Sequence, residues 1–419
     1  MRRLLIQTSA IQSLGVVFLI ATTLIVSRFS GPSTQGSFAL VKSFNDLQVA
    51  IFSLGLPPAI VIMLNRTQRG HHAIERVIGR YGIVLLLVLP PINFGLLSWT
   101  KADHDLILLQ ATLIGWGSAF FTVFAFLRAL LLVHTDGPKF SLISISHWLF
   151  IFVTAVLLLN RTDLIFEIAY FTAGLCALLA IYAMIRQYQP RALPPAVHDT
   201  VDWRMLRVQS TYVMIQTVLY GLQPFLTNAF LARVDPTLAM TGLFNIAALL
   251  ITLPNLLVAL IAPVLLNRWS KELDWHSYAS VQRHALLAGA FGQVAALLAL
   301  PLLPEAMRLV FGEAFVSAAA PTRILLLAVF AVIAGRILTP ALQGLERNDI
   351  VSWSCGMRVL AILAGTLAAH FAMGQSLILA LAVGWCVGEY AALAFLLIAS
   401  HRIRGKAVTG HLLARDRAH

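Results

Sequence analysis

Two pairs of oppositely charged residues lie within long apolar stretches of this sequence, where charges are costly. Lys42 and Asp46 are four residues apart, so they share one face of a helix. Arg358 and Glu389 lie in two later apolar stretches. An ionised side chain in the middle of a bilayer costs on the order of 3 kcal/mol unless it meets water or a partner. These residues could therefore bind charged groups, and the two acids could also carry protons.

The embedded cations outnumber the embedded acids. The cations are Lys42, Arg128, Arg336 and Arg358, and the acids are Asp46 and Glu389. We predict a net-cationic cavity in which these four cations and Asn45 bind an anionic head group, with Asp46 or Glu389 as the proton- or ion-coupling site. Two structural interpretations stay open. Lys42 can pair with Asp46 and Arg358 with Glu389, while Arg128 and Arg336 can extend to the inner membrane surface.

A stripe of amides and phenols marks the seventh apolar stretch. Gln209, Gln216 and Gln223 recur every seven residues, with Tyr212, Tyr220 and Thr227 on the same broad face. Amides facing lipid would lack hydrogen-bond partners, so they face protein or water. Hydrogen bonds between helices are one explanation. Contacts to a hydroxyl-rich ligand are the other, and they make Gln216, Tyr220 and Gln223 candidate sugar-binding residues.

Motifs for catalysis and for metal binding are missing from the sequence. It contains no G-x-x-x-x-G-K-[ST] loop for phosphates and no H-E-x-x-H pattern. The three cysteines, Cys176, Cys355 and Cys386, lie in apolar stretches without paired spacing, which favours small buried side chains over disulfides or zinc. We expect no enzyme activity, no catalytic residues, no metal site and no cofactor.

The composition predicts a polytopic membrane protein. Of the 419 residues 59% are hydrophobic and only 11% are charged, whereas about a quarter are charged in soluble domains. Apolar stretches near 20 residues long predict about twelve spanning helices. Their centres lie near Val17, Ala50, Val88, Phe120, Phe150, Ala177, Thr217, Leu253, Leu297, Phe330, Ala361 and Gly388.

The distribution of Lys and Arg gives the orientation. With the N-terminus inside, roughly 20 of the 30 Lys and Arg residues fall on the cytoplasmic side and only about five in the opposite loops. Both ends of the chain are therefore predicted to be cytoplasmic. This arrangement accounts for most of the net charge of +12, so nucleic-acid binding is not needed to explain it.

An internal repeat suggests two lobes. Gly31-Pro32 and Asp235-Pro236 are each followed by a glycine and a phenylalanine, Gly36 and Phe38 in one copy and Gly242 and Phe244 in the other. Both copies end in Leu-Asn-Arg, at 64–66 and 266–268. We predict an all-α fold of two pseudo-repeated six-helix bundles. The bundles span residues 1–188 and 204–400, with a cytoplasmic linker at 189–203 and a basic cytoplasmic tail at 401–419.

Several segments resemble the Wzx-like polysaccharide and O-antigen flippases, in the superfamily that also contains the MATE drug exporters. The resemblance lies in GPSTQGSFALVKSFNDLQVAIFSLGLPPAIVIMLNR, in TGLFNIAALLITLPNLLVALIAPVLLNRWSKE, and in the short segments LVFGEAF, LRALLL and LQGLERND. It implies two six-helix bundles around a central cavity that alternates between inward-open and outward-open states. It also implies that the substrate is a polyprenyl-pyrophosphate-linked oligosaccharide, moved from the inner to the outer leaflet. Pyrophosphate would be the anion for the embedded arginines.

From these residues and this resemblance we predict a flippase in the inner membrane of a bacterium. Its partners would be the lipid-linked saccharide, membrane lipids, and glycan polymerase or other assembly proteins. A MATE-type exporter of cationic drugs is one rival, but it should have an acid-dominated cavity. A non-transporting membrane scaffold of a glycan assembly complex is another. A polymerase or ligase fits less well, because no predicted outer loop is long.

Overall fold

The computed structural model describes residues 2–67, 71–100, 107–134, 137–159, 161–162, 164–188, 203–372, 374 and 376–416, and almost all of them are helical. The first half contains α1 (Arg2–Phe52), α2 (Leu56–Thr67), α3 (His71–Thr100), α4 (Ile107–His134), α5 (Gly137–Leu158), α6 (Ile165–Tyr188) and α7 (Trp203–Val234). Then follow α8 (Ala239–Glu272), α9 (Trp275–Ala299), η1 (Leu300–Leu302), α10 (Leu303–Phe311) and η2 (Glu313–Ala318). The last elements are α11 (Ala319–Leu326), α12 (Val329–Gly344), α13 (Asn348–Leu367), the π-helical turn η3 (Ala368–Ala372) and α14 (Leu377–Asp416).

The predicted all-helical membrane fold is confirmed. Within the described residues eight helices are long and apolar enough to cross a membrane, or nine if the bent α11–α12 pair is one span. All twelve predicted centres lie inside helices, but the count of twelve spans and the cytoplasmic position of both ends stay predictions. Two of the predicted spans form the single element α1, and α7 is not among the eight because its polar side chains lower its mean hydropathy.

A sharp break divides α1 where the sequence reads Gly31-Pro32. Gly31 has φ of 78° and ψ of −174°, a conformation that favours glycine. The second half of α1 ends at Phe52, where Leu54 and Gly55 both adopt positive φ, 52° and 65°. The sequence Gly55-Leu56-Pro57-Pro58 thus separates α1 from α2, with both prolines in the first turn of α2, where no helical N–H is lost.

Internal contacts divide the chain into two units. Unit 1 comprises Met1–Leu249 and Leu303–Ala319, and unit 2 comprises Leu250–Leu302 and Ala320–His419. Helix α8 begins in unit 1 and ends in unit 2. The predicted division at a linker stays a prediction, since residues 189–202 lie outside the described part of the chain.

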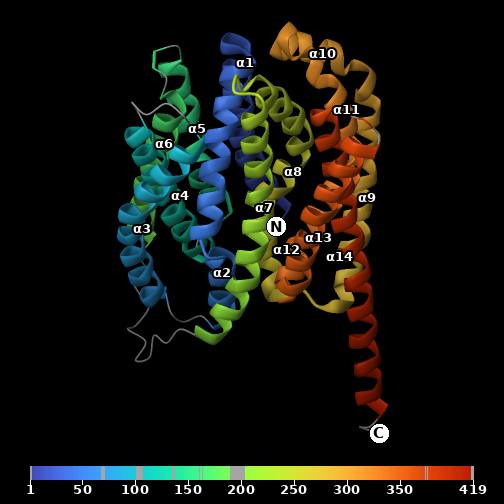
Figure 1. Ribbon diagram of the computed structural model, residues 1–419. Coiled ribbons are helices and arrows are strands. Elements are labelled where there is room, and N and C mark those ends of the chain that lie inside the picture. Colours follow the sequence, from blue (N-terminus) through green and yellow to red (C-terminus); the bar gives the residue numbers. More distant parts are fainter. Residues whose placement is uncertain are drawn as a thin grey trace. The chain divides into compact units, whose positions relative to one another are not determined.

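Unit 1 is built on α1, which contacts α4, α5, α6 and α7. Figure 1 shows α3, α4, α5 and α6 grouped beside α1. One buried cluster of its described residues joins Phe38 and Phe44 of α1 to Phe166 and Tyr170 of α6. The Phe38 ring lies 5.1 Å from that of Phe166, and the Phe44 ring lies 5.0 Å from that of Phe225 in α7.

Repeat-equivalent glycines meet where α1 and α8 cross. A Cβ atom on Gly36 would lie 2.1 Å from the carbonyl oxygen of Leu238, and one on Gly242 would lie 2.0 Å from that of Pro32 and 3.1 Å from the nitrogen of Gly36. No side chain fits at either position, because the obstacles are backbone atoms. The phenylalanines that follow in the two copies, Phe38 and Phe244, are both fully buried.

A short segment between α9 and α11 belongs to unit 1 by its contacts. Residues Leu303–Ala319 form α10 and η2, which pack on α1. The guanidinium of Arg28 donates hydrogen bonds to the carbonyls of Arg308 and Leu309, each at 3.3 Å. These carbonyls lie in the last turn of α10, where a cation is favourable.

Unit 2 is centred on the close packing of α13 against α14. Gly365 of α13 faces Gly384 of α14, and a Cβ atom on Gly388 would lie 2.9 Å from the carbonyl of Arg358. Helix α12 packs on α9 and on α14, and Ala334 and Leu338 of α12 belong to the buried cluster of this unit.

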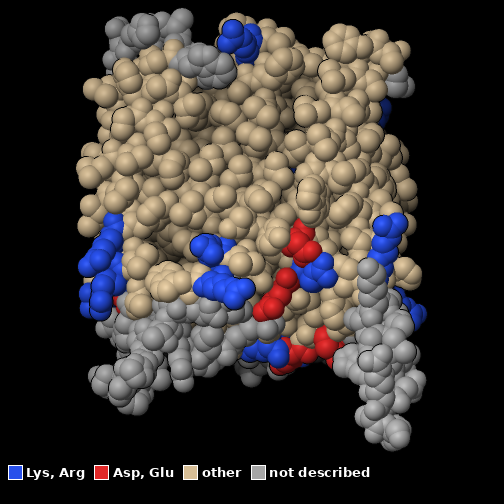
Figure 2. Space-filling view, turned by 60° about the horizontal axis from the view of Figure 1, so that its bottom comes forward, with Lys and Arg blue, Asp and Glu red and all other residues tan. Residues whose placement is uncertain are grey.

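Charged side chains are sparse on the visible surface. Figure 2 shows the visible Lys, Arg, Asp and Glu side chains mostly in the lower half of the view, while uncharged residues cover most of the surface above them. That pattern is expected for helices whose middle sections lie in lipid.

Candidate functional site

Lys42 and Asp46 form an ion pair within α1, one of the two pairings that the sequence suggested. Their side chains are 31% and 40% exposed, so the pair lies in the apolar second half of α1 without being sealed off. Because both residues are on one helix, the pair does not hold two helices together. It places a cation and an acid side by side on an accessible face of α1.

Two buried amides fix the rotation of this helix. Asn45 accepts a hydrogen bond from the hydroxyl of Ser118 in α4 at 2.9 Å, and Gln48 forms a two-way amide pair with Asn93 in α3. A buried amide without partners would be costly, so these contacts hold one face of α1 against α3 and α4. The structure thus gives Asn45, a predicted substrate-binding residue, a partner within the protein.

Two side chains of other helices lie within electrostatic range of the Lys42–Asp46 pair. The charge of Asp46 acts on the Tyr170 phenol of α6, and both Lys42 and Arg128 act on the His147 ring of α5. The guanidinium of Arg128, in α4, also lies over the Phe140 ring, 5.5 Å from its centroid. We call Lys42, Asp46 and Arg128, linked through their effects on His147 and Tyr170, the charged cluster of unit 1.

Arg358 and Glu389 also form an ion pair, as the alternative interpretation proposed, and this pair joins α13 to α14. The two side chains are only 7% and 12% exposed. Arg336 of α12 is close enough to interact with both charges and with Cys355. These three charged residues form the charged cluster of unit 2, which contains two arginines and one carboxylate.

The polar stripe of α7 is partly used by the protein itself. Contacts to α1 come from Asn228, which donates to the carbonyl of Ala39 at 3.2 Å, and from Thr217, which donates to that of Ala50 at 3.5 Å. Among the nominated residues, Gln223 is buried with neither amide atom hydrogen-bonded to any described residue. Gln216 and Tyr220 are half-buried on the same helix.

Sequence reasoning missed three residues of unit 1. His147 and Tyr170 were not nominated, because neutral aromatic side chains in apolar stretches usually belong to the core. Glu167, in the first turn of α6, is only 3% exposed, so unit 1 contains a second embedded acid. An acidic residue within the apolar segment LIFEIAYF is the sequence signal that could have identified it.

Neither cluster has the composition of a metal site. Within the described residues no three His, Cys, Asp or Glu side chains converge on a point that could hold a metal ion. Cys176, Cys355 and Cys386 are all free thiols. Both clusters consist of charged side chains on helices, most of which are long enough to cross a membrane.

Solved structures with this arrangement of helices are transporters. A mutant of the Vibrio cholerae MATE transporter VcmN matches with a TM-score of 0.73 and 14% sequence identity, over 96% of each chain. The chain has the MATE fold. The MATE multidrug transporter DinF-BH, solved as a complex with a ligand, matches this fold with a TM-score of 0.69 and 16% identity, again over 96% of each chain.

A third match comes from the wider superfamily. It is a MOP superfamily transporter from Pyrococcus furiosus, and its binding pocket is described as having a reverse polarity that suggests a different function. The TM-score is 0.71 and the sequence identity is 13%, over 96% of this chain and 95% of that one. No family model and no curated protein matches the sequence of this chain. The predicted MATE-like fold is therefore established by structure, at low sequence identity.

Proposed function

We propose that this protein moves a polyprenyl-pyrophosphate-linked oligosaccharide from the inner to the outer leaflet of a bacterial plasma membrane. The observation that carries the proposal is the charged cluster of unit 2, in which two arginines, Arg336 and Arg358, accompany one carboxylate, Glu389. Unit 1 adds the accessible pair Lys42–Asp46 and a further embedded cation, Arg128.

The physical argument concerns the net charge of the unit 2 cluster. One carboxylate neutralises one cation, so two arginines with Glu389 leave an excess positive charge among largely apolar helices. Such a charge is costly unless an anion or water compensates for it. Pyrophosphate carries several negative oxygens, and arginine binds such oxygens with two parallel hydrogen bonds. The lipid tail would remain in the bilayer while the head group moves.

The amides of α7 support a saccharide ligand. Gln223 is buried, and its amide group makes no hydrogen bond to any described residue. An amide both donates and accepts, which suits the hydroxyl groups of a sugar. We assign sugar contacts to Gln216, Tyr220 and Gln223 on this basis.

For coupling, we propose that a proton binds Asp46 in preference to Glu389. The Asp46 side chain is 40% exposed, whereas that of Glu389 is 12% exposed and held between two helices. Protonation of Asp46 would release Lys42 without separating any helices. An imposed pH gradient should then accelerate flipping in proteoliposomes, and Asp46→Asn should remove the acceleration. A rate that does not depend on the gradient contradicts this coupling.

A MATE-type drug exporter is the second candidate. It is favoured by the MATE fold, by the match to the multidrug transporter DinF-BH, and by the additional acid Glu167 in unit 1. Against it, the binding pocket of reverse polarity in the Pyrococcus furiosus transporter is described as suggesting a different function for that protein of the same fold. A non-transporting scaffold would need all its embedded polar groups paired, which the buried amide of Gln223 does not favour.

Depletion of the protein in its host separates the candidates. Polyprenyl-linked saccharides would be quantified by mass spectrometry, and retention of a cationic dye would be followed in parallel. We expect one lipid-linked glycan to accumulate on the cytoplasmic side, with a mass that gives its sugar composition. Unchanged glycans with increased dye retention would identify a drug exporter, and no change in either would favour the scaffold.

A further inference from the structure

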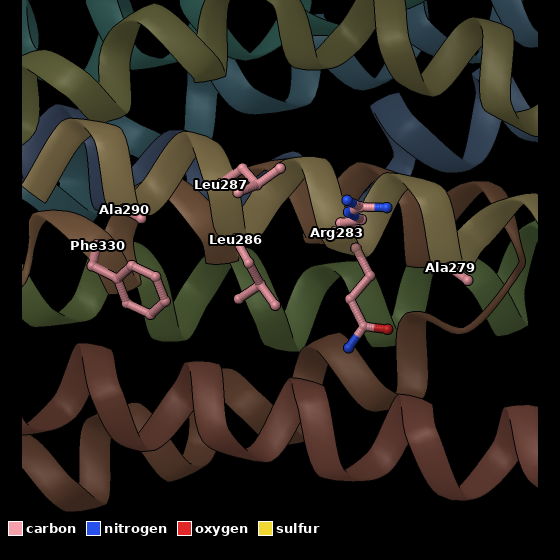
Figure 3. Close-up of a pocket in the computed structure, with 7 residues that line it drawn as sticks. Ala279, Arg283, Leu286, Leu287, Ala290 and Phe330 are labelled. Atoms are coloured by element: carbon pink, nitrogen blue, oxygen red, sulfur yellow. The ribbon is translucent and has the colours of Figure 1, made fainter.

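A groove on the surface of unit 2 has no role in the function proposed above. It has a volume of about 470 Å³ and is lined by one face of α9 and by Phe330 of α12. Figure 3 shows Ala290 and Phe330 at one end of this groove, Leu286 and Leu287 in its middle, and Arg283 and Ala279 at the other end. Gln282 completes the lining.

The helix that forms the groove is the one most exposed to its surroundings. Only 11% of the residues in the most apolar stretch of Ser277–Phe311 are buried, the lowest share of any candidate span in the described residues. Leu287, Phe291, Val294 and Leu298 of α9 are all exposed. Since such a surface is unfavourable in water, this side of α9 faces the hydrocarbon chains of the membrane.

The polar end of the groove carries a positive charge that the protein does not neutralise. Some exposed arginines of the described chain pair with carboxylates, as Arg268 does with Glu272 and Arg308 with Glu313. Arg283 is exposed, and no carboxylate of the described residues pairs with it. From Leu286 to Ala290 the lining is entirely apolar. An apolar groove that ends at a single cation is complementary to a chain with an anionic head.

The apolar part of the groove fits within one leaflet. From Arg283 to Ala290 a helix rises about 10 Å at 1.5 Å per residue, which is less than half of the roughly 30 Å hydrocarbon core. Part of one acyl chain whose head group lies at Arg283 would therefore lie along the groove without crossing the midplane. A site within one leaflet, open on its lipid side, suits a lipid that stays in its leaflet.

We infer that this groove binds an anionic glycerophospholipid of the bilayer. Its phosphate would accept hydrogen bonds from Arg283 and Gln282, and one acyl chain would lie against Leu286, Leu287 and Phe330. The lipid is a bound component of unit 2 and not the transported substrate. This inference is independent of the proposed flipping activity and holds equally for a drug exporter.

Native mass spectrometry of the full-length, delipidated protein tests this site. Phosphatidylglycerol and phosphatidylcholine with identical acyl chains would be added in parallel. We expect wild type to retain phosphatidylglycerol preferentially, and Arg283→Gln to weaken that retention by about tenfold, the effect of one charge-assisted hydrogen bond. The matched control is Arg80→Gln, which removes an exposed arginine near the start of α3, outside the groove.

A second pair of variants tests the apolar part of the groove without changing the charge. Ala290→Phe would fill the groove and should weaken retention, whereas Ala295→Phe, at an exposed position of the same helix that does not line it, should not. Equal retention of the two phospholipids, or wild-type retention by Arg283→Gln, would overturn the proposal. Displacement of phosphatidylglycerol by a polyprenyl phosphate at equal concentration would also overturn it, and would assign the groove to the transported class of lipid.

Discussion

The two charged clusters contain similar residues but are built in opposite ways. In unit 1 the ion pair lies along one helix, α1, and both side chains remain about one third exposed. In unit 2 the ion pair joins α13 to α14 and is almost completely buried. The first pair can open without moving a helix, whereas the second cannot.

The energetic consequences differ accordingly. A partly exposed pair at i, i+4 contributes only about 0.3–0.5 kcal/mol to stability. Removing one partner of a buried pair costs about 3–5 kcal/mol, because the other charge is left without compensation. The contrast indicates that ion pairs of similar composition can have different roles. An accessible pair can open and exchange its partner, whereas a buried pair holds two helices together. Four experiments test it, beginning with the one that should change stability most.

The largest effect is expected from Glu389→Ala. This variant leaves Arg358 buried without its ion-pair partner and still close to Arg336. We expect the free energy of unfolding in detergent to fall by about 3–5 kcal/mol, measured by thermal or denaturant unfolding. A double variant, Arg358→Met with Glu389→Leu, should recover most of the loss, since well-packed apolar groups can replace a buried pair. A single variant as stable as wild type would refute the cohesive role.

Unit 1 should depend more on backbone packing than on its ion pair. Gly36→Val should cost about 1–3 kcal/mol, because its side chain would collide with the carbonyl of Leu238. The same unfolding measurement applies. Gly335→Ala is the matched control, since an added Cβ meets nothing within 4 Å there and alanine favours helix. If both glycine variants behave alike, the close crossing of α1 and α8 does not depend on glycine.

A smaller effect on stability is expected from Lys42→Ala, together with a large effect on transport. The pair is partly exposed and lies within one helix, so the unfolding free energy should change by no more than about 0.5 kcal/mol. Flipping of lipid-linked saccharide in proteoliposomes should nevertheless be abolished. A variant that loses as much stability as Glu389→Ala would remove the distinction between the clusters. Full transport activity would instead remove Lys42 from the proposed substrate site.

The smallest effect concerns a carboxylate outside the spanning helices. Asp235 accepts hydrogen bonds from the Met240 nitrogen at 2.7 Å and the Thr237 hydroxyl at 2.6 Å, and these contacts hold its pKa below the usual value. Because the pKa of Asp235 is lower in the folded state than in the unfolded state, the ionised side chain stabilises the fold above about pH 4. This contribution is lost as the pH falls through the folded-state pKa. Asp235→Asn should therefore lower stability slightly at pH 7. The difference from wild type should vanish in acid, as followed by thermal unfolding against pH.

Local patterns in the sequence predicted the helices well. The spacing of four placed Lys42 beside Asp46, because that arrangement depends only on neighbouring residues. Gly31-Pro32, which the repeat singled out, lies at the break within α1. The pairing of Arg358 with Glu389 was one of two open interpretations. Choosing between them required knowing that α13 and α14 pack closely through Gly365, Gly384 and Gly388.

Partners from distant helices could not be predicted. Asn45 was nominated for substrate binding, but nothing in the sequence shows that Ser118 lies opposite it. His147 and Tyr170 belong to the unit 1 cluster only because α5 and α6 pack beside α1. The segment Leu303–Ala319 follows α9 in sequence, yet its contacts place it in unit 1. Each of these outcomes depends on packing between residues far apart in the sequence or on a chain that leaves one unit and returns.

The glycine crossing of α1 and α8 also constrains how this protein can evolve. Gly36 and Gly242 occupy equivalent places in the two copies of the repeat, and each lies against the backbone of the other copy. A mutation to a larger residue at one of them cannot be rescued by a smaller residue at the other, because glycine is already the smallest. Selection should therefore preserve both positions together in descendants of this gene, even where the surrounding sequence has drifted beyond recognition.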